Sequence, residues 1–377
     1  MSLALSHLSA IEIYRSPLLI KACPYFDSGQ PGLKTASRRP VNLERCSAPK
    51  KSDLDLLEKT FPDLLSYPVH TTVGQQDKRR AYDDLICHIN SSKATVLPLD
   101  VAALTQSGEK TGIPGALDRN KTQAYSPLRR SPYVVIPELA FLQAASFLSS
   151  IDLILFGCEL CGAYGISTTS SQTSQTSNEN LRDSGTFAHR PFTNTAKISR
   201  FIETISQDPH RRTPNIHKAK KALESVLDNS ASPRESALSL MITAKRSEGG
   251  YALPKPILNQ KIPINRSARH LFPRSFYRCD LFWPDANLAV EYDSDKFHSG
   301  TDKISQDSSR RGALNLLGID VITVTNRQIS HVSEMDRVAR SIAKKLNHRI
   351  RTERRYDYSS RKLALQNRLL DYGSPRA

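Results

Sequence analysis

Two apolar runs, each interrupted by an acid, stand out in the stretch "YRCDLFWPDANLAVEYDSDKFH", residues 277–298. Two runs rich in aromatic and branched side chains flank a Pro-Asp-Ala-Asn cluster, a pattern typical of a β-hairpin. If residues 284–287 form the loop, Trp283 pairs with Leu288 across the hairpin. The hairpin then carries one acid in the middle of each strand.

In this register Asp280 lies opposite Glu291. Directly opposed side chains share one face of a sheet, and two like charges in that arrangement repel each other. A divalent cation or a protonated carboxyl would relieve the repulsion. The alternative is that both acids face solvent beside neighbours such as Arg278. The pattern alone leaves both interpretations open.

Further elements are predicted on both sides of the hairpin. Ser232 and Pro233 predict a helix start, and Glu235 three residues after the serine completes a capping box. The segment "DKISQDSSRRGALNLLG" predicts a helix with Leu314 and Leu317 facing inward and a stop at Gly318. "IDVITVT" predicts a strand. The order is helix, strand, strand, helix, strand, with strands 288–293 and 320–325 parallel if they share a sheet.

The rest of the chain predicts an earlier mixed α/β region, with a strand at "PVHTTV" and a strand followed by two apolar helices in 133–166. A Ser/Thr/Gln/Asn tract then buries too little apolar surface to order itself. The expected segments are an unassigned N-terminal segment (1–60), a mixed α/β domain (61–166), a flexible linker (167–186), a helical connector (187–230), a second α/β domain (231–350) and a basic helical tail (351–377).

Charge narrows the class of partner. The 377 residues carry a net charge of +16. Residues 231–377 hold 26 lysines and arginines against 15 acids, which is +11 of that total. Such an excess favours a polyanion, nucleic acid before an anionic membrane surface. The N-terminus lacks the basic region of a secretory signal, and no apolar run is long enough to span a bilayer, so a cytoplasmic protein is expected.

The six cysteines are therefore expected to be reduced. Cys158 and Cys161 form a C-x-x-C pair, but a zinc site would need further ligands, and only Cys87 with His88 is suggestive. Two half-buried cysteines at a helix end are favoured over a metal or redox pair.

The segments "SPRES", "RCDLFWPDANLAVEYDSDKFH" and "DSSRRGALNLLGIDVITVT" resemble a known family over about residues 231–330. It is the C-terminal PD-(D/E)xK, or restriction-endonuclease-like, domain of uncharacterised bacterial proteins related to the very-short-patch-repair endonuclease. The resemblance implies an α/β nuclease-like fold with a mixed sheet flanked by helices. A weaker resemblance links residues 133–165 to AbiEi-type abortive-infection regulators.

The family pattern falls on Glu235, Asp280, Glu291, Asp293, His298, Asp307, Arg310 or Arg311, Leu314 and Gly318. It implies that Asp280 and Glu291 bind Mg²⁺ or Mn²⁺, with Glu235 assisting. His298 is either a general acid–base or phosphate group or a surface histidine. Asp293 stands where the wider superfamily has its catalytic lysine, and Lys296 or Lys303 are the nearest replacements in sequence.

Two functions remain open on this basis. The first is a metal-dependent DNA endonuclease with Glu235, Asp280, Glu291, Asp293, Lys296 and His298 in its site. The second is a catalytically inactive DNA-binding regulator or toxin–antitoxin component with a partner protein, which Asp293 and the upstream resemblance favour. In either case phosphate contacts are expected from the basic run near the C-terminus, at Lys344, Lys345, Arg349, Arg351, Arg354 and Arg355.

Overall fold

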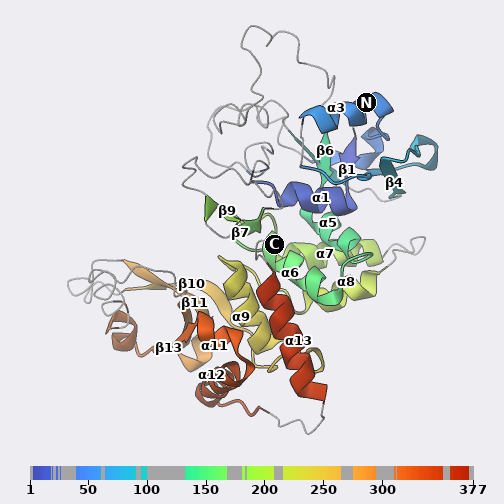
Figure 1. Cartoon of the computed structure of the whole chain (residues 1–377). Coiled ribbons are helices and arrows are strands. Elements are labelled where there is room, and N and C mark those ends of the chain that lie inside the picture. Colours follow the sequence, from blue (N-terminus) through green and yellow to red (C-terminus); the bar gives the residue numbers. More distant parts are fainter. Residues whose placement is uncertain are drawn as a thin grey trace. The chain divides into compact units, whose positions relative to one another are not determined.

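In the computed structural model the chain folds into two compact units (Figure 1). The described residues are 3–17, 19, 23, 26, 40–60, 64–90, 95–99, 132–167, 181–182, 185–207, 215–264, 275–293, 310, 312–350 and 357–372. The first unit comprises Met1–Leu160, Tyr164–Glu224 and Pro375–Ala377, and the second comprises Cys161–Ala163 and Ser225–Ser374. Both combine helices with mixed sheets, so the prediction of a mixed α/β protein is confirmed.

The first unit is built on a six-stranded mixed sheet in the order β2-β5-β6-β1-β3-β4. Its strands are β1 (Ala4–Leu5), β2 (Val41–Asn42), β3 (Val69–Val73), β4 (Leu85–Ile89), β5 (Thr95–Pro98) and β6 (Tyr133–Val135). β1 pairs parallel with β6 and antiparallel with β3, and β3 pairs parallel with β4. The N-terminal segment, which the sequence left unassigned, thus supplies a central strand.

Helices and a small antiparallel sheet complete this unit. They are α1 (His7–Tyr14), the 3₁₀ turns η2 (Leu43–Arg45) and η3 (Gln76–Lys78), α3 (Lys51–Thr60), α5 (Pro137–Ala144), α6 (Ser150–Leu160), α7 (Thr195–Ser206), α8 (Ile216–Leu223) and the sheet β7 (Tyr164–Ile166), β9 (Thr186–Ala188), β8 (Leu181–Arg182). Helices α5 and α6 are buried over most of their length, as their apolar sequences predict. The Tyr14 hydroxyl donates to the carbonyl of Val135 at 2.8 Å and fastens α1 to β6.

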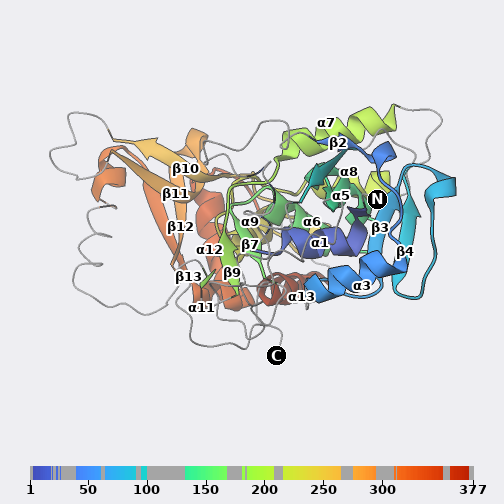
Figure 2. The same ribbon diagram turned by 90° about the horizontal axis from the view of Figure 1, so that it is seen from above.

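The second unit contains a four-stranded sheet in the order β10-β11-β12-β13 (Figure 2). Its elements are α9 (Pro233–Thr243), η5 (Arg246–Glu248), β10 (Ile257–Pro263), β11 (Phe276–Trp283), η7 (Pro284–Ala286), β12 (Leu288–Asp293), β13 (Asp320–Thr325), α11 (Asn326–Ser330), α12 (Val332–Lys345) and α13 (Asp357–Asp371). β10, β11 and β12 run antiparallel, and β13 runs parallel to β12.

The hairpin has the predicted register, with Trp283 paired to Leu288, and the parallel pairing of 288–293 with 320–325 is also confirmed. Helical residues 310 and 312–316 lie between β12 and β13 in the chain, and Gly318 ends them with φ +71°, a left-handed conformation that favours glycine. The sequence analysis missed β10. Its run "ILNQKIP" carries three polar residues and a proline, so it lacks a clear strand pattern.

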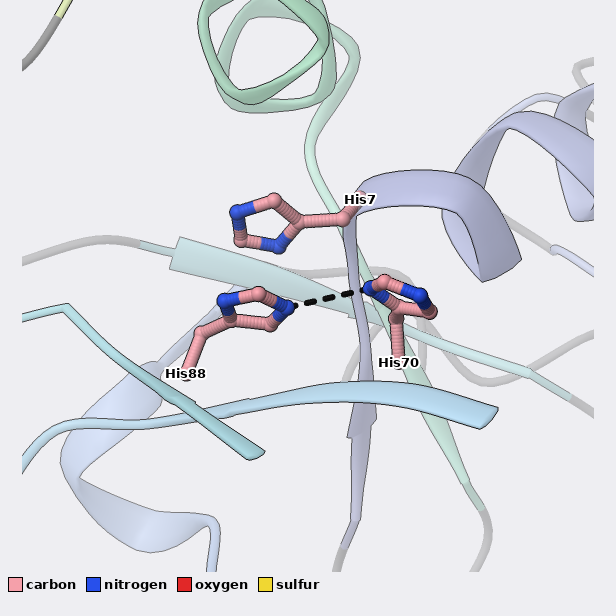
Figure 3. A group of neighbouring side chains, drawn as sticks. All are labelled: His7, His70 and His88. Carbon is pink, nitrogen blue, oxygen red and sulfur yellow. Dashed lines mark hydrogen bonds between the residues drawn. The ribbon is translucent and has the colours of Figure 1, made fainter. Parts of the chain in front are cut away.

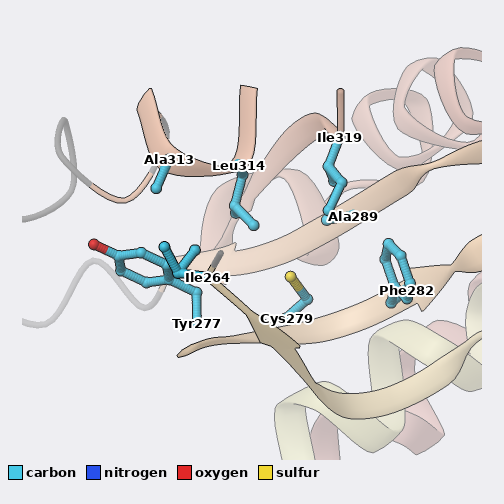
Figure 4. Close-up of a cluster of buried hydrophobic side chains, with 8 residues drawn as sticks. All are labelled: Ile264, Tyr277, Cys279, Phe282, Ala289, Ala313, Leu314 and Ile319. Carbon is cyan, nitrogen blue, oxygen red and sulfur yellow. The ribbon is translucent and has the colours of Figure 1, made fainter. Parts of the chain in front are cut away.

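Apolar side chains from the sheet and the crossover helix form one core cluster, shown in Figure 4. Leu314 is 1% exposed within it, and Leu317 packs against it, as the helical pattern predicted. The cluster contains Ile264, Tyr277, Cys279, Phe282, Ala289, Ala313, Leu314 and Ile319. This cluster fixes the helix that connects β12 to β13, here called the crossover helix, against β11 and β12. Arg310, at the start of the described part of that helix, is positioned with it.

The C-terminal helices pack against the same unit. Val338 and Ile342 of α12 are buried. On α13 the Tyr358 hydroxyl donates to the carbonyl of Gly250 at 2.8 Å. Gly249 has φ +95°, and a Cβ there would lie 2.4 Å from the carbonyl oxygen of Arg361, so this crossing requires glycine. Among the described helices, none is both long and apolar enough to cross a membrane.

Candidate functional site

The first acid of the predicted site, Glu235, lies in the first turn of α9. Ser232 caps the helix by accepting a hydrogen bond from the backbone N–H of Glu235, and its hydroxyl donates to Oε1 of Glu235 at 3.0 Å. Oε2 of Glu235 accepts from the N–H of Ala231 at 2.9 Å and from the Asn259 side chain at 2.7 Å. Ser232 therefore caps the helix as predicted, but the Glu235 side chain accepts from the N–H of Ala231 rather than from that of Ser232, so the reciprocal capping box is not formed.

Glu235 is nonetheless more deeply placed than a cap requires, since only 9% of the residue is exposed. Its donor on β10, Asn259, has φ +53°, a left-handed conformation that asparagine tolerates better than most residues. The pKa of Glu235 is raised by burial and, second, by the charge of Asp280. The helix start therefore lies within electrostatic reach of the hairpin acid.

Asp280 lies on β11, one residue beyond the last ladder pair of the hairpin, Leu281 with Val290. Its Oδ2 accepts from the backbone N–H of Tyr292 at 2.9 Å, so a side chain replaces the ladder at this point. Burial raises the pKa of Asp280, whereas the Tyr292 N–H, Arg310 and Arg278 lower it. Asp280 is thus a half-buried carboxylate held at the end of the paired region.

Glu291, on β12, is the third acid and has the largest resolved change. Burial and the charge of Asp280 raise the pKa of Glu291 to about 8, against the opposing effect of Arg310. Its side chain is 13% exposed. Among the described residues, no side chain or backbone group donates to the buried Oε1, whereas Oε2 accepts from the Arg310 guanidinium at 2.5 Å.

Arg310 is the positive charge that the opposed acids require. Its guanidinium also donates to the backbone carbonyl of Arg278, which ties the crossover helix to β11. The sequence analysis had considered Arg278 for this pairing. The structure gives the pairing with Glu291 to Arg310, one of the two arginines that the family resemblance placed here.

The three acids therefore form one electrostatic group with Asp280 as the shared neighbour, but they are not a closed metal cage. In the part of the chain that is described, the three-residue group whose ligand atoms all lie within 4.8 Å of one another is a histidine group elsewhere. Asp280 and Glu291 are the better placed pair for a cation, because the described part of the chain gives Glu291 Oε1 no hydrogen-bond donor.

The other predicted catalytic residues divide into two classes. Asp293 is exposed at the end of β12. Lys296 and His298 lie outside the described residues, as do Lys303, Asp307 and Arg311.

The predicted phosphate contacts are only partly described. Lys344 and Lys345, at the end of α12, and Arg349 are exposed. Lys345 is paired with Oδ2 of Asp320 at 2.5 Å. Arg351, Arg354 and Arg355 lie outside the described residues. The described basic surface thus offers Lys344 and Arg349 more freely than Lys345.

The cysteine pair is buried as expected. Cys158 and Cys161 are 1% and 0% exposed, and both are free thiols. Deep burial suits small apolar side chains and leaves little access for redox chemistry.

Sequence analysis missed a histidine cluster in the first unit. His7 of α1, His70 of β3 and His88 of β4 each place one ligand atom within 4.8 Å of the others (Figure 3). Nδ1 of His70 and Nε2 of His88 are hydrogen-bonded at 3.0 Å, and the His7 ring stacks on His88 with centroids 3.5 Å apart. These residues are spread over most of the first 90 positions, so no spacing motif marks them. Of the three, the sequence points only to His88 as a possible metal ligand, because it follows Cys87.

Comparison with known proteins found no family model, curated protein or solved structure that matches the chain.

Proposed function

We propose that the second unit is a metal-dependent DNA endonuclease-like domain that hydrolyses phosphodiester bonds. The observation that carries this proposal is the gathering of two carboxyl groups, Glu235 of α9 and Glu291 of β12, around Asp280 of β11. Burying like charges together is costly unless a cation offsets them, and such arrangements are common at active sites. The order helix, hairpin, helix, strand supports the proposal because it carried the family resemblance.

The donor set fits a hard divalent cation such as Mg²⁺ or Mn²⁺. These ions prefer oxygen ligands and are often held by one or two carboxylates with several waters. Glu291 Oε1 is a buried oxygen with no donor among the described residues. Burial raises the pKa of both Asp280 and Glu291, and a bound cation would offset this cost by stabilising their ionised forms. Asp280 and Glu291 would hold the ion, with Glu235 behind them.

Such an ion supplies positive charge at the reacting phosphate and lowers the pKa of a bound water. The chain's own residues have separate tasks. Asp280 is oriented by the Tyr292 N–H, and Glu235 is held by Ser232, Ala231 and Asn259, so neither depends on the ion for its position. Arg310 balances Glu291 and offers a cation to a phosphate oxygen beside the acids.

The decisive measurement is cleavage of supercoiled plasmid and single-stranded DNA with Mg²⁺ or Mn²⁺. Asp280→Asn and Glu291→Gln should each lower the rate at least about 100-fold, because even outer-shell changes at metal sites cost about 10–100-fold. Asp285→Asn, in the exposed hairpin turn, is the matched control and should cleave like wild type. Equal rates for wild type and Asp280→Asn would exclude this site.

A second function is favoured by one specific observation, the pairing of Arg310 with Glu291. An arginine already satisfies part of the charge, as in a domain that binds DNA without cutting it. The exposed Asp293 at the superfamily's lysine position points the same way. For a DNA-binding regulator or toxin–antitoxin component, DNA binding should persist in EDTA, and no metal should produce cleavage.

A further inference from the structure

We propose that His7, His70 and His88 bind one divalent transition-metal ion, with Zn²⁺ as the occupant. One ring nitrogen of each histidine lies within 4.8 Å of the others. Zinc binds imidazole nitrogen at about 2.0–2.1 Å in a tetrahedral arrangement, so three such atoms reach one ion once the side chains rotate. Three protein ligands leave a fourth position for water or another small donor. This site is in the first unit and does not rest on the proposed nuclease function.

Ordered backbone, rather than a loop, carries the three ligands. His70 and His88 lie on neighbouring parallel strands, where Thr72 pairs with His88. The carbonyl of His70 accepts from the N–H of Ser6 at 3.0 Å, and its own N–H donates to the Ser9 hydroxyl at 2.9 Å. These bonds set the start of α1, and therefore His7, directly over the two strands (Figure 3).

His7 itself is held in an uncommon conformation. Its φ is +49°, in the left-handed region that non-glycine residues seldom adopt. Its N–H donates to Oε1 of Gln143 at 3.2 Å, which anchors the turn to α5. The fold thus keeps an unfavourable backbone angle at the residue that completes the cluster, an arrangement often found at functional positions.

Neutral imidazole is the form of histidine that ligates metals. Burial is the first cause that lowers the pKa of each ring, and the neighbouring histidines reinforce it for His7 and His88. All three residues are half-buried rather than enclosed, so an ion can enter. Cys87 takes no part, because adjacent residues of a strand point to opposite faces and Cys87 is buried.

Ion binding has a definite structural consequence. Lone pairs of imidazole lie in the ring plane, and the His7 and His88 planes are only 18° apart in a stack. One of these rings must rotate for both to reach the same ion. The hydrogen bond between His70 Nδ1 and His88 Nε2 must also break, because the proton it holds lies where the ion is bound.

The histidine site and the acidic site should prefer different metals, because the first offers imidazole nitrogen and the second offers carboxylate oxygen. Zinc, copper and nickel accept three nitrogen ligands, whereas Mg²⁺ prefers oxygen. Dialysed protein should retain one Zn²⁺ per chain when zinc is titrated against a chromophoric chelator. Co²⁺ in its place should give the visible absorption of a four-coordinate ion, and excess Mg²⁺ should leave both signals unchanged.

Three variants and one control decide the proposal. His70→Asn, His88→Gln and His7→Gln should each weaken zinc affinity at least about 100-fold, more than the loss typical of outer-shell changes. His217→Gln, an exposed histidine of α8 in the same unit, should bind like wild type. Zinc should raise the thermal midpoint of wild type but not that of His88→Gln, and circular dichroism in EDTA establishes that each variant is folded.

Two results would overturn the proposal. One is full-length protein that binds no zinc above the chelator's background, which would make the cluster three packed neutral histidines. The other is zinc binding that is unchanged in all three variants, which would place the ion at other ligands.

Discussion

Arg310 donates to Oε2 of Glu291, and the partner oxygen of the same carboxylate, Oε1, has no donor among the described residues. Arg310 therefore holds one oxygen of this carboxylate, and the Cys279 thiol is the other side chain that faces the group. Measurements on Glu291 should therefore distinguish a catalytic site from a purely structural ion pair.

Replacing Arg310 tests how much the pair stabilises the fold. We expect Arg310→Gln to lower the free energy of unfolding by about 1–3 kcal/mol, the cost of leaving a buried polar group without its partner. Urea unfolding in EDTA at about pH 8.5 measures it, where more of Glu291 is ionised. Arg327→Gln, an exposed arginine of α11, is the control and should be near neutral. A loss no larger than that of the control would mean that the pair is solvated.

The acids predict a pH dependence of stability. Burial and Asp280 raise the pKa of Glu291 to about 8 from an ordinary value of 4.5. The folded chain then holds the proton more tightly than the unfolded chain. The resulting stability is complete below the unfolded pKa and is lost as the pH rises through the folded one.

Thermal unfolding in EDTA should therefore show a lower midpoint at about pH 8.5 than at about pH 5.5. The groups that face Glu291 are Asp280, Cys279 and Arg310, and burial together with Glu291 raises the pKa of the Cys279 thiol to about 12, so the thiol does not titrate in this range. In Glu291→Gln the difference between the two midpoints should shrink. A variant with the full wild-type pH difference would assign it to other groups.

The helix cap can be separated from the acidic group. Ser232→Ala removes the side chain that accepts from the Glu235 N–H, and we expect a loss of about 1 kcal/mol in the free energy of unfolding. Ser341→Ala, at an exposed position within α12, is the control and should be neutral or slightly stabilising. Chemical denaturation of both variants provides the comparison. Loss of the same size in both would remove the capping role.

The basic surface predicts a salt dependence of DNA binding. Lys344→Ala with Arg349→Ala should lower affinity similarly for unrelated duplexes and flatten the slope of log affinity against log salt by up to about two units. Fluorescence anisotropy at several salt concentrations measures this slope. Lys220→Ala with Lys221→Ala, on the exposed face of α8, is the matched control. If the Lys220 and Lys221 variant changes the slope and the Lys344 and Arg349 variant does not, the DNA binds to the first unit.

The basic residues outside the described part of the chain need a variant of their own. Arg354→Ala with Arg355→Ala should flatten the same slope by up to about two units, as expected for two phosphate contacts. An unchanged slope would return this run to a solvated surface.

Sequence patterns predicted local features well because local chemistry determines them. The hairpin register followed from the Pro-Asp-Ala-Asn turn between two apolar runs, and the start of α9 followed from Ser232, Pro233 and Glu235. β10 was not predictable in the same way. This polar run forms a strand because it pairs with β11, and such a tertiary effect leaves no periodic pattern in the sequence.

The candidate sites show the same limit. The positions of Asp280 and Glu291 could be read from one hairpin, but the partner of Glu291 comes from a helix 19 residues further along the chain. The three histidines come together only when β1 enters the sheet beside β3, which places α1 over the strands. Long-range pairing of this kind leaves no spacing to read.

The shared position of Asp280 has a consequence for how the acidic site would respond to a cation. Burial raises the pKa of Glu235, Asp280 and Glu291, and the charge of Asp280 raises it further for Glu235 and Glu291, so the number of protons held by the three acids together describes the site better than any single residue. A divalent ion that binds there must displace a proton from the set near neutral pH. Calorimetry in two buffers with different ionisation enthalpies would count that released proton, and the apparent affinity for the ion would rise as the solution becomes more alkaline.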